Sequence, residues 1–233
     1  MPPSGWRRGR QWVRREAPMT EAQWLACEDP MAMLGFLRGK ASDRKLRLFA
    51  VRCCRRITHL LDPRGLTALT IAERFADGLA SEEQLRGAEG LAEDAFNEFD
   101  HAKEYAAEAV MAACDREALE GSTWRAAYIA IHLRLYRPLL AGTNRLTQRK
   151  GCGWLRDMFN PYRPSALAPA SLIPTVTWLA EGIYEDRGFD RLPILGDALE
   201  EAGCTDHDLL GHLRSPGPHV RGCWALDLVL GKG

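Results

Sequence analysis

Five residues near the end of the chain are of the types that bind soft or borderline metal ions. Cys204, His207, His212, His219 and Cys223 follow the spacing C-x2-H-x4-H-x6-H-x3-C within GCTDHDLLGHLRSPGPHVRGCW. Zinc prefers four such ligands in a tetrahedron. Because Cys204 precedes a predicted helix and His212 lies near its end, the turn that follows can bring the side chains together. The candidate zinc ligands are four of these residues: Cys204, His212, His219 and Cys223.

The same residues also have an interpretation without a metal. A helix that starts at Val220 would place His219 and Cys223 one turn apart, but the overall spacing matches no common zinc motif. A buried Cys204, a capping His212 and a core Cys223 are ordinary roles for these residue types. From the sequence alone we favour this structural interpretation and keep the zinc site as the alternative.

A predicted helix from Asp43 to Leu61 has one strongly basic side. Its apolar residues recur at spacings of three and four and form the opposite face: Leu46, Phe49, Cys53, Ile57 and Leu60. The candidate contacts to a nucleic acid or another anionic partner are four arginines: Arg44, Arg52, Arg55 and Arg56. Such a helix can bind phosphates or a membrane surface. We favour charges that are solvated or paired inside the protein, since the next segment is rich in carboxylates.

Basic and acidic residues, 31 of each, are separated along the chain. Residues 1–65 contain 14 basic and 6 acidic side chains, and residues 66–120 contain 4 and 14. Residues 121–163 contain 8 and 1, and residues 164–233 contain 5 and 10. Exposed ion pairs contribute only about 0–1 kcal/mol each to stability. The charge pattern therefore has more effect on which helices pack together than on the stability of the fold. We expect basic and acidic helices to pack against each other.

Two further patterns could carry chemistry. Arg125 and His132 fit the R-x4-6-H spacing of helical HEPN ribonucleases, in which an arginine binds phosphate and a histidine moves a proton. So loose a pattern is common in arginine-rich helices. A group of four carboxylates could hold magnesium: Glu181, Glu185, Asp186 and Asp190. Such a run of acidic residues is more often a solvated helix face. The sequence contains no G-x-S-x-G, no P-loop and no G-x-G-x-x-G.

Helix signals dominate, and alternation of apolar and polar residues is almost absent, which predicts an all-α protein. Capping patterns mark helix starts at Thr20, Asp29, Ser42 and Ser81, and Thr205 with Asp208 suggests another. We expect an irregular multi-helix bundle with a smaller C-terminal helical subdomain. A long central helix should follow Ser81 and reach about Leu119, with a further helix over residues 124–140.

The expected organisation has four parts. Residues 1–18 carry five arginines and are interpreted as a disordered basic tail or as a start assigned too far upstream. Residues 19–160 should form a helical domain, and residues 161–175 a proline-rich linker. Residues 176–233 should form a C-terminal helical subdomain packed on the first.

Compartment is predicted from absent signals and from the cysteines. The sequence has no apolar run of 18 or more residues and no apolar stretch typical of a secretory signal. Seven cysteines, an odd number, then indicate reduced thiols. We expect a cytoplasmic protein.

Both ends of the sequence resemble an expanded family of uncharacterised proteins from planctomycete-type bacteria. The resemblance rests on MTEAQWLACEDPMAMLGFLRGKASDRKLRLFAVRCCRRI from Met19 and on the ending GPHVRGCWALDLVLGKG, and it covers roughly residues 19–60 and 154–233. It implies that Met19 is the usual start and that His207 is incidental to the family-like ending. It implies no activity and no catalytic residues.

The function that we favour from the sequence is a non-enzymatic module for protein–protein contact, since strong catalytic motifs are absent and the charge blocks could pair with a protein partner. A zinc-binding module built on the C-terminal cysteines and histidines is the first alternative. Nucleic-acid binding through the basic helix is the second.

Overall fold

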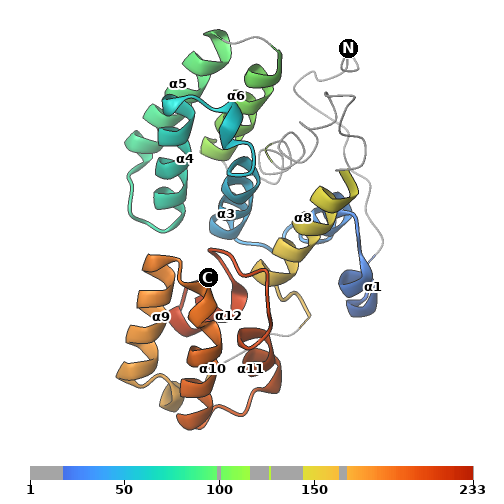
Figure 1. Cartoon of the computed structure of the whole chain (residues 1–233), viewed down its shortest axis with the longest axis vertical. Coiled ribbons are helices and arrows are strands. Elements are labelled where there is room, and N and C mark those ends of the chain that lie inside the picture. Colours follow the sequence, from blue (N-terminus) through green and yellow to red (C-terminus); the bar gives the residue numbers. More distant parts are fainter. Residues whose placement is uncertain (1–17, 99–100, 116–125, 127–143, 163–166, 233) are drawn as a thin grey trace.

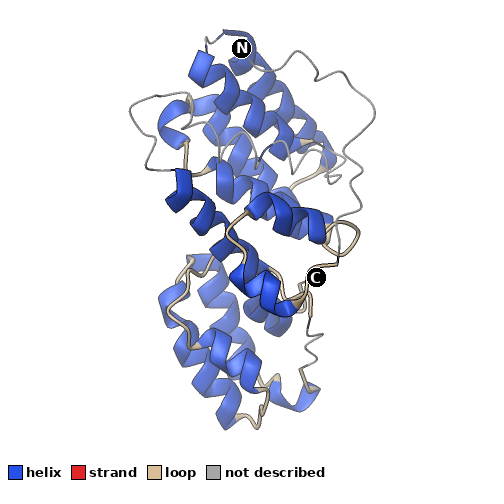
Figure 2. Cartoon of the chain, turned by 90° about the vertical axis from the view of Figure 1, so that its right-hand side faces the viewer, coloured by secondary structure: helices blue, strands red, loops and turns tan. Residues whose placement is uncertain are grey.

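Figure 1 shows the computed structural model of the chain, in which an N-terminal group of helices lies above a C-terminal group. The structure describes residues 18–98, 101–115, 126, 144–162 and 167–232. Every regular element within these ranges is a helix (Figure 2), which confirms the predicted all-α multi-helix fold. In this described part, no helix is both long and apolar enough to cross a bilayer.

The N-terminal group contains seven α-helices and one short 3-10 helix among the described residues. In chain order these are α1 (Glu21–Ala26), α2 (Pro30–Phe36), α3 (Asp43–Cys54), η1 (Thr58–Leu60), α4 (Pro63–Ala76), α5 (Glu82–Glu98), α6 (His101–Cys114) and α8 (Asn144–Met158). The successive helices α4, α5 and α6 pack side by side, and α8 packs against α2 and α3.

The C-terminal group is built from shorter helices. In chain order these are η4 (Pro169–Ser171), α9 (Pro174–Asp186), η5 (Phe189–Arg191), α10 (Leu192–Glu201), α11 (His207–Leu213) and α12 (Trp224–Leu230). Helix α9 contacts both α10 and α12, and so does α11. The expected linker at residues 161–175 therefore contains a 3-10 turn, whereas its residues 163–166 lie outside the described ranges.

Most helix starts follow from local hydrogen bonds that the sequence predicts. Thr20 and Gln23 form a complete capping box at α1, with each side chain bonded to the other residue's backbone N–H. Ser81 and Gln84 do the same at α5. Asp29 caps α2, whose first residue is Pro30. These caps satisfy backbone N–H groups that have no partner within the helix.

Several helix boundaries differ from the prediction. Helix α3 ends at Cys54 and a 3-10 turn follows, so it does not continue to Leu61. The predicted long central helix is wrong, because its stretch contains two helices, α5 and α6, that pack against each other. Two shorter alanine-rich helices bury one another's small side chains, which one long helix could not do. The predicted helix at 124–140 lies almost wholly outside the described residues, and so do Arg125 and His132.

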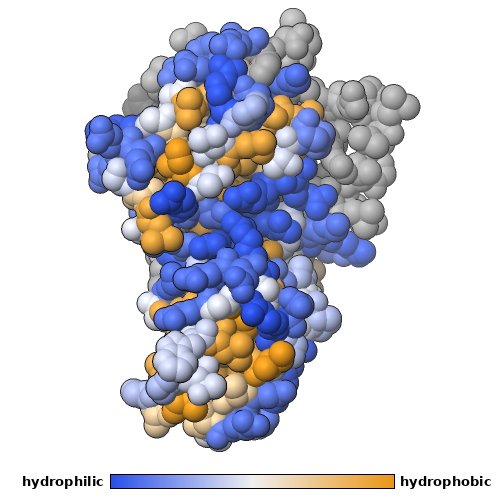
Figure 3. All heavy atoms as spheres, turned by 60° about the vertical axis from the view of Figure 1, so that its left-hand side comes forward, coloured by the Kyte–Doolittle hydropathy of each residue, from blue (hydrophilic) through white to orange (hydrophobic). Residues whose placement is uncertain are grey.

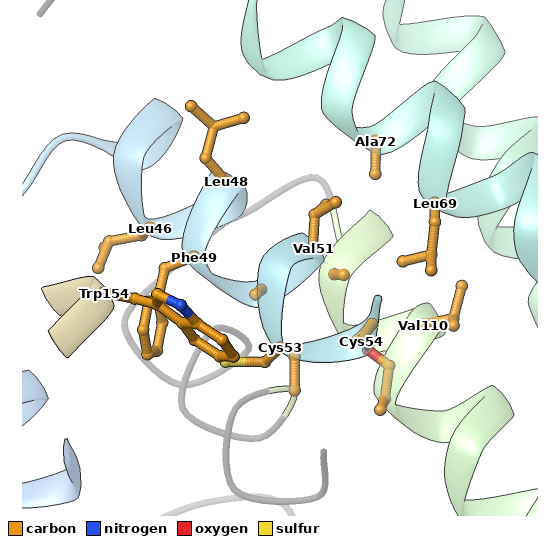
Figure 4. Packing of buried hydrophobic residues seen from close by; sticks show 14 of the residues in the cluster. Leu46, Leu48, Phe49, Val51, Cys53, Cys54, Leu69, Ala72, Val110 and Trp154 are labelled. Carbon is orange, nitrogen blue, oxygen red and sulfur yellow. Dashed lines mark hydrogen bonds between the residues drawn. The ribbon is translucent and has the colours of Figure 1, made fainter. Parts of the chain in front are cut away.

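Helix α3 is the centre of the N-terminal core. Phe49, Cys53 and Cys54 on this helix are at most 1% exposed. Figure 4 shows them between α4 and α6 on one side and Trp154 of α8 on the other. Because burying a large apolar side chain contributes about 1.5–3 kcal/mol, this contact fixes α8 relative to α3. The position of α8 matters because this helix carries Asp157, a residue of the candidate site.

A buried ion network joins the two groups of helices. The Arg44 guanidinium of α3 donates to Asp227 of α12 at 2.7 Å and to Asp77 at 3.0 Å. Asp77 also accepts from the Tyr184 hydroxyl of α9 at 2.5 Å and from Arg221 at 2.7 Å. Neither carboxylate is more than 2% exposed. Arg44 and Asp77 therefore each have partners in both groups, which fixes the C-terminal helices on α3 and α4.

Other ion pairs join the segments of opposite charge. Arg55 binds Glu73 at 2.6 Å, and Arg64 binds Glu98 at 2.7 Å. These pairs, with Arg44–Asp77, connect the basic segment 1–65 to the acidic segment 66–120. Hydrophilic side chains also cross the middle of the face in Figure 3, between the two helical groups. The described contacts therefore agree with the expected pairing of charge blocks.

Candidate metal centre

Three of the four predicted zinc ligands meet in the structure. His212 lies in the last turn of α11, His219 in the loop after it, and Cys223 is the residue that precedes α12. Asp157 joins them, and one potential ligand atom from each of the four side chains lies within 4.8 Å of all the others. Three of these residues come from the C-terminal group, and Asp157 comes from α8 in the N-terminal group.

Asp157 lies at the centre of this group. Its Oδ1 is 2.7 Å from Nδ1 of His219 and 3.1 Å from Nε2 of His212. Its Oδ2 accepts the backbone N–H of Val220 at 2.8 Å. Burial alone would raise the pKa of this carboxyl, but the hydrogen bonds from both histidines hold it below its usual value. Asp157 is therefore an ionised, buried carboxylate that also positions the loop carrying His219.

His219 is oriented by contacts on both sides of its ring. Its Nε2 is 3.0 Å from the backbone carbonyl oxygen of Ser215, opposite the Nδ1 that faces Asp157. Metal-binding histidines usually donate their second N–H to such an oxygen, which fixes the tautomer and the ring orientation. Without a metal, both nitrogens face acceptors. Burial lowers the pKa of His219, but the bond to Asp157 outweighs it, so the pKa is raised.

Cys223 completes the group with a fully buried sulfur. Its Sγ lies 3.3 Å from Nε2 of His212, and the residue is 0% exposed. Burial raises the pKa of this thiol well above its usual value, and the charge of Asp157 raises it further. The thiol is therefore a poor nucleophile in the absence of a cation. A bound metal ion would supply the positive charge that a buried thiolate needs.

The spacing of the four atoms is close to that around a tetrahedral zinc ion. Zinc ligands lie about 2.0–2.3 Å from the ion, which separates neighbouring ligand atoms of a tetrahedron by roughly 3.3–3.8 Å. The closest contacts, from 2.7 to 3.3 Å, would have to expand slightly, and a pair near the 4.8 Å limit of the group would have to close by about 1 Å. Two imidazoles, one thiolate and one carboxylate form a mixed nitrogen, sulfur and oxygen set of the kind that zinc accepts.

Cys204 is not part of the group, unlike the prediction from the sequence. It is 7% exposed and buried in the C-terminal core, just before α11. His212 lies at the opposite end of this helix, and a seven-residue helix is about 10 Å long. The helix that separates the two residues also keeps them apart. The start of α11 differs from the prediction as well, because Asp206 and not Thr205 caps it.

Asp157 was missed because it is distant in sequence from the other three residues. One signal in the sequence does mark it. It is the only acidic residue among eight basic ones in residues 121–163.

The group borders an open pocket of about 500 Å³. Asp157, His212 and His219 line its wall, together with four aromatic residues from both helical groups: Trp24, Phe159, Tyr162 and Trp224. Cys223 does not line the pocket, so the group is buried on the sulfur side and accessible from the other. A metal ion has a path of entry to the site from this pocket.

The four arginines of the basic helix do not form one outward face. Arg44 is turned into the buried network with Asp77 and Asp227. Arg55 pairs with Glu73. The guanidinium carbons of Arg52 and Arg56 lie 4.6 and 5.7 Å from the Trp154 ring. These contacts weaken the case for the predicted nucleic-acid interface, because the arginines that would bind a duplex mostly contact other residues of the protein.

The acidic residues in and just after α9 form a solvated face, as the simpler interpretation of the sequence expects. All four are exposed: Glu181, Glu185, Asp186 and Asp190. Asp186 pairs with Arg191 at 2.8 Å. Within the described residues, these carboxylates are not gathered around one point as the Asp157 group is.

Known proteins offer no assignment for this arrangement. A scan of protein-family models, a search of curated proteins and a search of solved structures all found no match. The resemblance to a planctomycete-type bacterial family therefore stays a prediction.

Proposed function

We propose that this protein binds one zinc ion through Asp157, His212, His219 and Cys223, and that the ion fastens the C-terminal helices to α8. The observation that carries the proposal is the convergence of four ligand atoms within 4.8 Å of one another. Their residue types and their burial support it. So does the contact of His219 with the Ser215 carbonyl, which leaves Nδ1 free to act as a ligand.

A structural role is favoured over a catalytic one by the number of protein ligands. Structural zinc sites have four protein side chains, whereas catalytic sites have three and keep one position for water or substrate. Here four side chains are available. They also come from both helical groups, so an ion would link α8 to the loop between α11 and α12.

Metal analysis of the purified, untagged protein tests the proposal directly. We expect about one zinc per chain in the wild type and well under one in Cys223→Ser. Cys204→Ser is the matched control, since it removes a buried cysteine of the same helical group that lies outside the site. Equal zinc content in the two variants, or a wild type with little zinc, would refute the proposal.

Cobalt substitution gives a second readout that identifies the ligands. A thiolate bound to cobalt produces a charge-transfer absorption that nitrogen and oxygen ligands do not give. This band should be present in the wild type and in Cys204→Ser and absent in Cys223→Ser. His207→Gln, which changes an exposed histidine outside the group, should leave the spectrum unchanged.

Protein–protein contact is the second candidate function, and one observation favours it. Four of the large exposed apolar side chains are in or just before α9 and α10: Leu172, Ile173, Trp178 and Ile194. Figure 3 shows apolar side chains on this lower part of the molecule. Trp178 is 71% exposed, which is unusual for a tryptophan without a partner.

Sedimentation velocity tests this candidate for the simplest partner, a second copy of the chain. Trp178→Ser should shift an associating protein towards monomer. Leu79→Ser, which changes an apolar residue of similar exposure (60%) in the N-terminal group, should not. A wild type that remains monomeric at high concentration would argue against self-association.

A further inference from the structure

A second pocket, of about 190 Å³, lies where α3 and α4 meet the C-terminal helices. Four arginines line it, whereas Glu73 is the single carboxylate in its wall. The basic residues are Arg52, Arg55, Arg187 and Arg221. The apolar part of the wall consists of Leu48, Phe189 and Val220. The pocket is therefore strongly cationic.

The carboxylates near the pocket do not balance its positive charge. Glu73 is shared by two of the arginines, since Arg55 donates to its Oε2 at 2.6 Å and Arg187 pairs with the same oxygen. Arg221 pairs with Asp77, which also binds Arg44. Arg52 has no carboxylate partner in the described part of the chain, and its guanidinium lies over the Trp154 ring. The pocket therefore keeps an excess of positive charge.

Two donors of the same arginines also lack partners. The Nε atoms of Arg52 and Arg55 are buried and make no hydrogen bond within the described residues. Burial lowers the pKa of Arg52, and the neighbouring charges of Arg56, Arg55 and Arg187 lower it further. A buried donor or charge without a partner is costly, and a bound anion would relieve both costs.

We propose that this pocket binds a small phosphate-type oxyanion, either inorganic phosphate or the phosphate group of a small monoester. The planar guanidinium fork matches phosphate oxygens and binds them with charge-assisted hydrogen bonds. The volume is smaller than the roughly 300–1,000 Å³ of pockets for drug-sized ligands, so it suits a compact anion. The proposal does not depend on zinc, although His219 lines this pocket as well as the first one.

Isothermal titration calorimetry with inorganic phosphate tests the pocket, in protein treated with chelator and again in zinc-loaded protein. We expect binding in both, weakened about tenfold or more by Arg52→Gln. Arg86→Gln is the matched control, because it removes the same charge from an exposed position on α5. Equal phosphate affinity in Arg52→Gln and Arg86→Gln, or no binding by the wild type, would overturn the proposal.

A second variant guards against a failure of Arg52→Gln to fold. The Arg187 side chain is 43% exposed, so Arg187→Gln should fold normally and still weaken phosphate binding. Binding that appears only after zinc loading and survives both substitutions would place the anion on the metal and overturn the proposal. Failure of zinc binding is measured separately by metal analysis, so the two proposals can fail independently.

The source of the phosphate is distinguished by comparing ligands. Tighter binding of glycerol phosphate than of inorganic phosphate, with the same dependence on Arg52, would assign the pocket to a monoester. Equal or weaker binding would assign it to free phosphate. Binding of single-stranded RNA that phosphate does not displace would contradict a small-anion pocket.

Discussion

Asp157 and His219 are 62 positions apart in the chain, yet Oδ1 of the one lies 2.7 Å from Nδ1 of the other. This contact joins the last turn of α8 to the loop between α11 and α12. It is the point at which the two helical groups and the proposed metal centre depend on each other. The metal, Asp157 and the surrounding core can each be removed separately, so their contributions to stability can be distinguished.

Removal of zinc should destabilise the protein. An ion that binds only the folded chain adds stability that grows with the ratio of its free concentration to its Kd, about 2.7 kcal/mol at a hundredfold excess. We expect chelator to lower the midpoint of thermal unfolding of the wild type and of Cys204→Ser. Cys223→Ser should already unfold at a lower temperature than the wild type, and chelator should not lower its midpoint further. A wild type whose midpoint is unchanged by chelator would contradict a stabilising metal.

Asp157→Asn should be destabilising with or without metal. The side chain is 4% exposed and contacts both histidines and the Val220 N–H, so the amide leaves some of these groups without an acceptor. We expect a loss of about 2–4 kcal/mol in the free energy of unfolding, measured with urea in the presence of chelator. The exposed substitution Asp186→Asn should cost less than about 1 kcal/mol. Similar losses for both would mean that the buried contacts contribute little.

Gly222→Ala should disturb the site through its neighbours. Gly222 has φ +91°, and a Cβ there would lie 2.9 Å from Cε of Met158 and 3.1 Å from Cδ1 of Leu48. Gly78 also has a positive φ, +72°, but a Cβ there meets nothing within 4 Å. Both alanine variants carry the backbone strain, so the difference isolates the steric contact. We expect Gly222→Ala to be less stable than Gly78→Ala by about 1–3 kcal/mol and to weaken zinc binding at the adjacent Cys223.

Acid should weaken the junction between the helical groups through Asp77. Burial alone would raise the pKa of Asp77, but the hydrogen bond from Tyr184 and the charges of Arg221 and Arg44 lower it. A carboxyl with a lowered folded pKa contributes stability in full above its unfolded pKa, about 3.9, and loses it as the pH falls through the folded value. Unfolding measured from pH 6 to pH 2 should therefore show a loss of stability below about pH 4 that is smaller in Asp77→Asn, in which Asp157 keeps its own lowered pKa.

Phe49→Ala tests the packing that positions α8. The ring is 0% exposed within the N-terminal core (Figure 4), and its removal leaves a cavity near Trp154. We expect a loss of about 3–5 kcal/mol in the free energy of unfolding by urea. A loss below about 1 kcal/mol would show that the core around α3 rearranges to fill the space.

The sequence predicts those parts of the fold that depend on neighbouring residues. The capping boxes at Thr20 and Ser81 and the proline start at Pro30 are local, and the structure contains all three. The sequence does not predict the break between α5 and α6. The spacing of apolar residues shows which face of a helix can be buried, but it does not show which other helix packs on that face. The same limit applies to the end of α3 at Cys54.

The site was only partly predictable for a related reason. His212, His219 and Cys223 are close in the chain, so their spacing pointed to a common site. The expected helical turn between the last two is nevertheless wrong, since α12 begins at Trp224 and a loop brings His219 to Cys223. Cys204 was chosen by residue type, but α11 separates it from the group. Asp157 depends on how α8 packs, which no local pattern reveals.

The order of the four residues along the chain has a consequence for biosynthesis. Asp157 leaves the ribosome first, and Cys223 is made last, after all of α9, α10 and α11. The centre can close only when the polypeptide has been extended through residue 223. A nascent or truncated chain that stops before residue 212 would leave the Asp157 carboxylate at the end of α8 without any of its partners in the centre, so closure of the centre marks the completion of translation through residue 223.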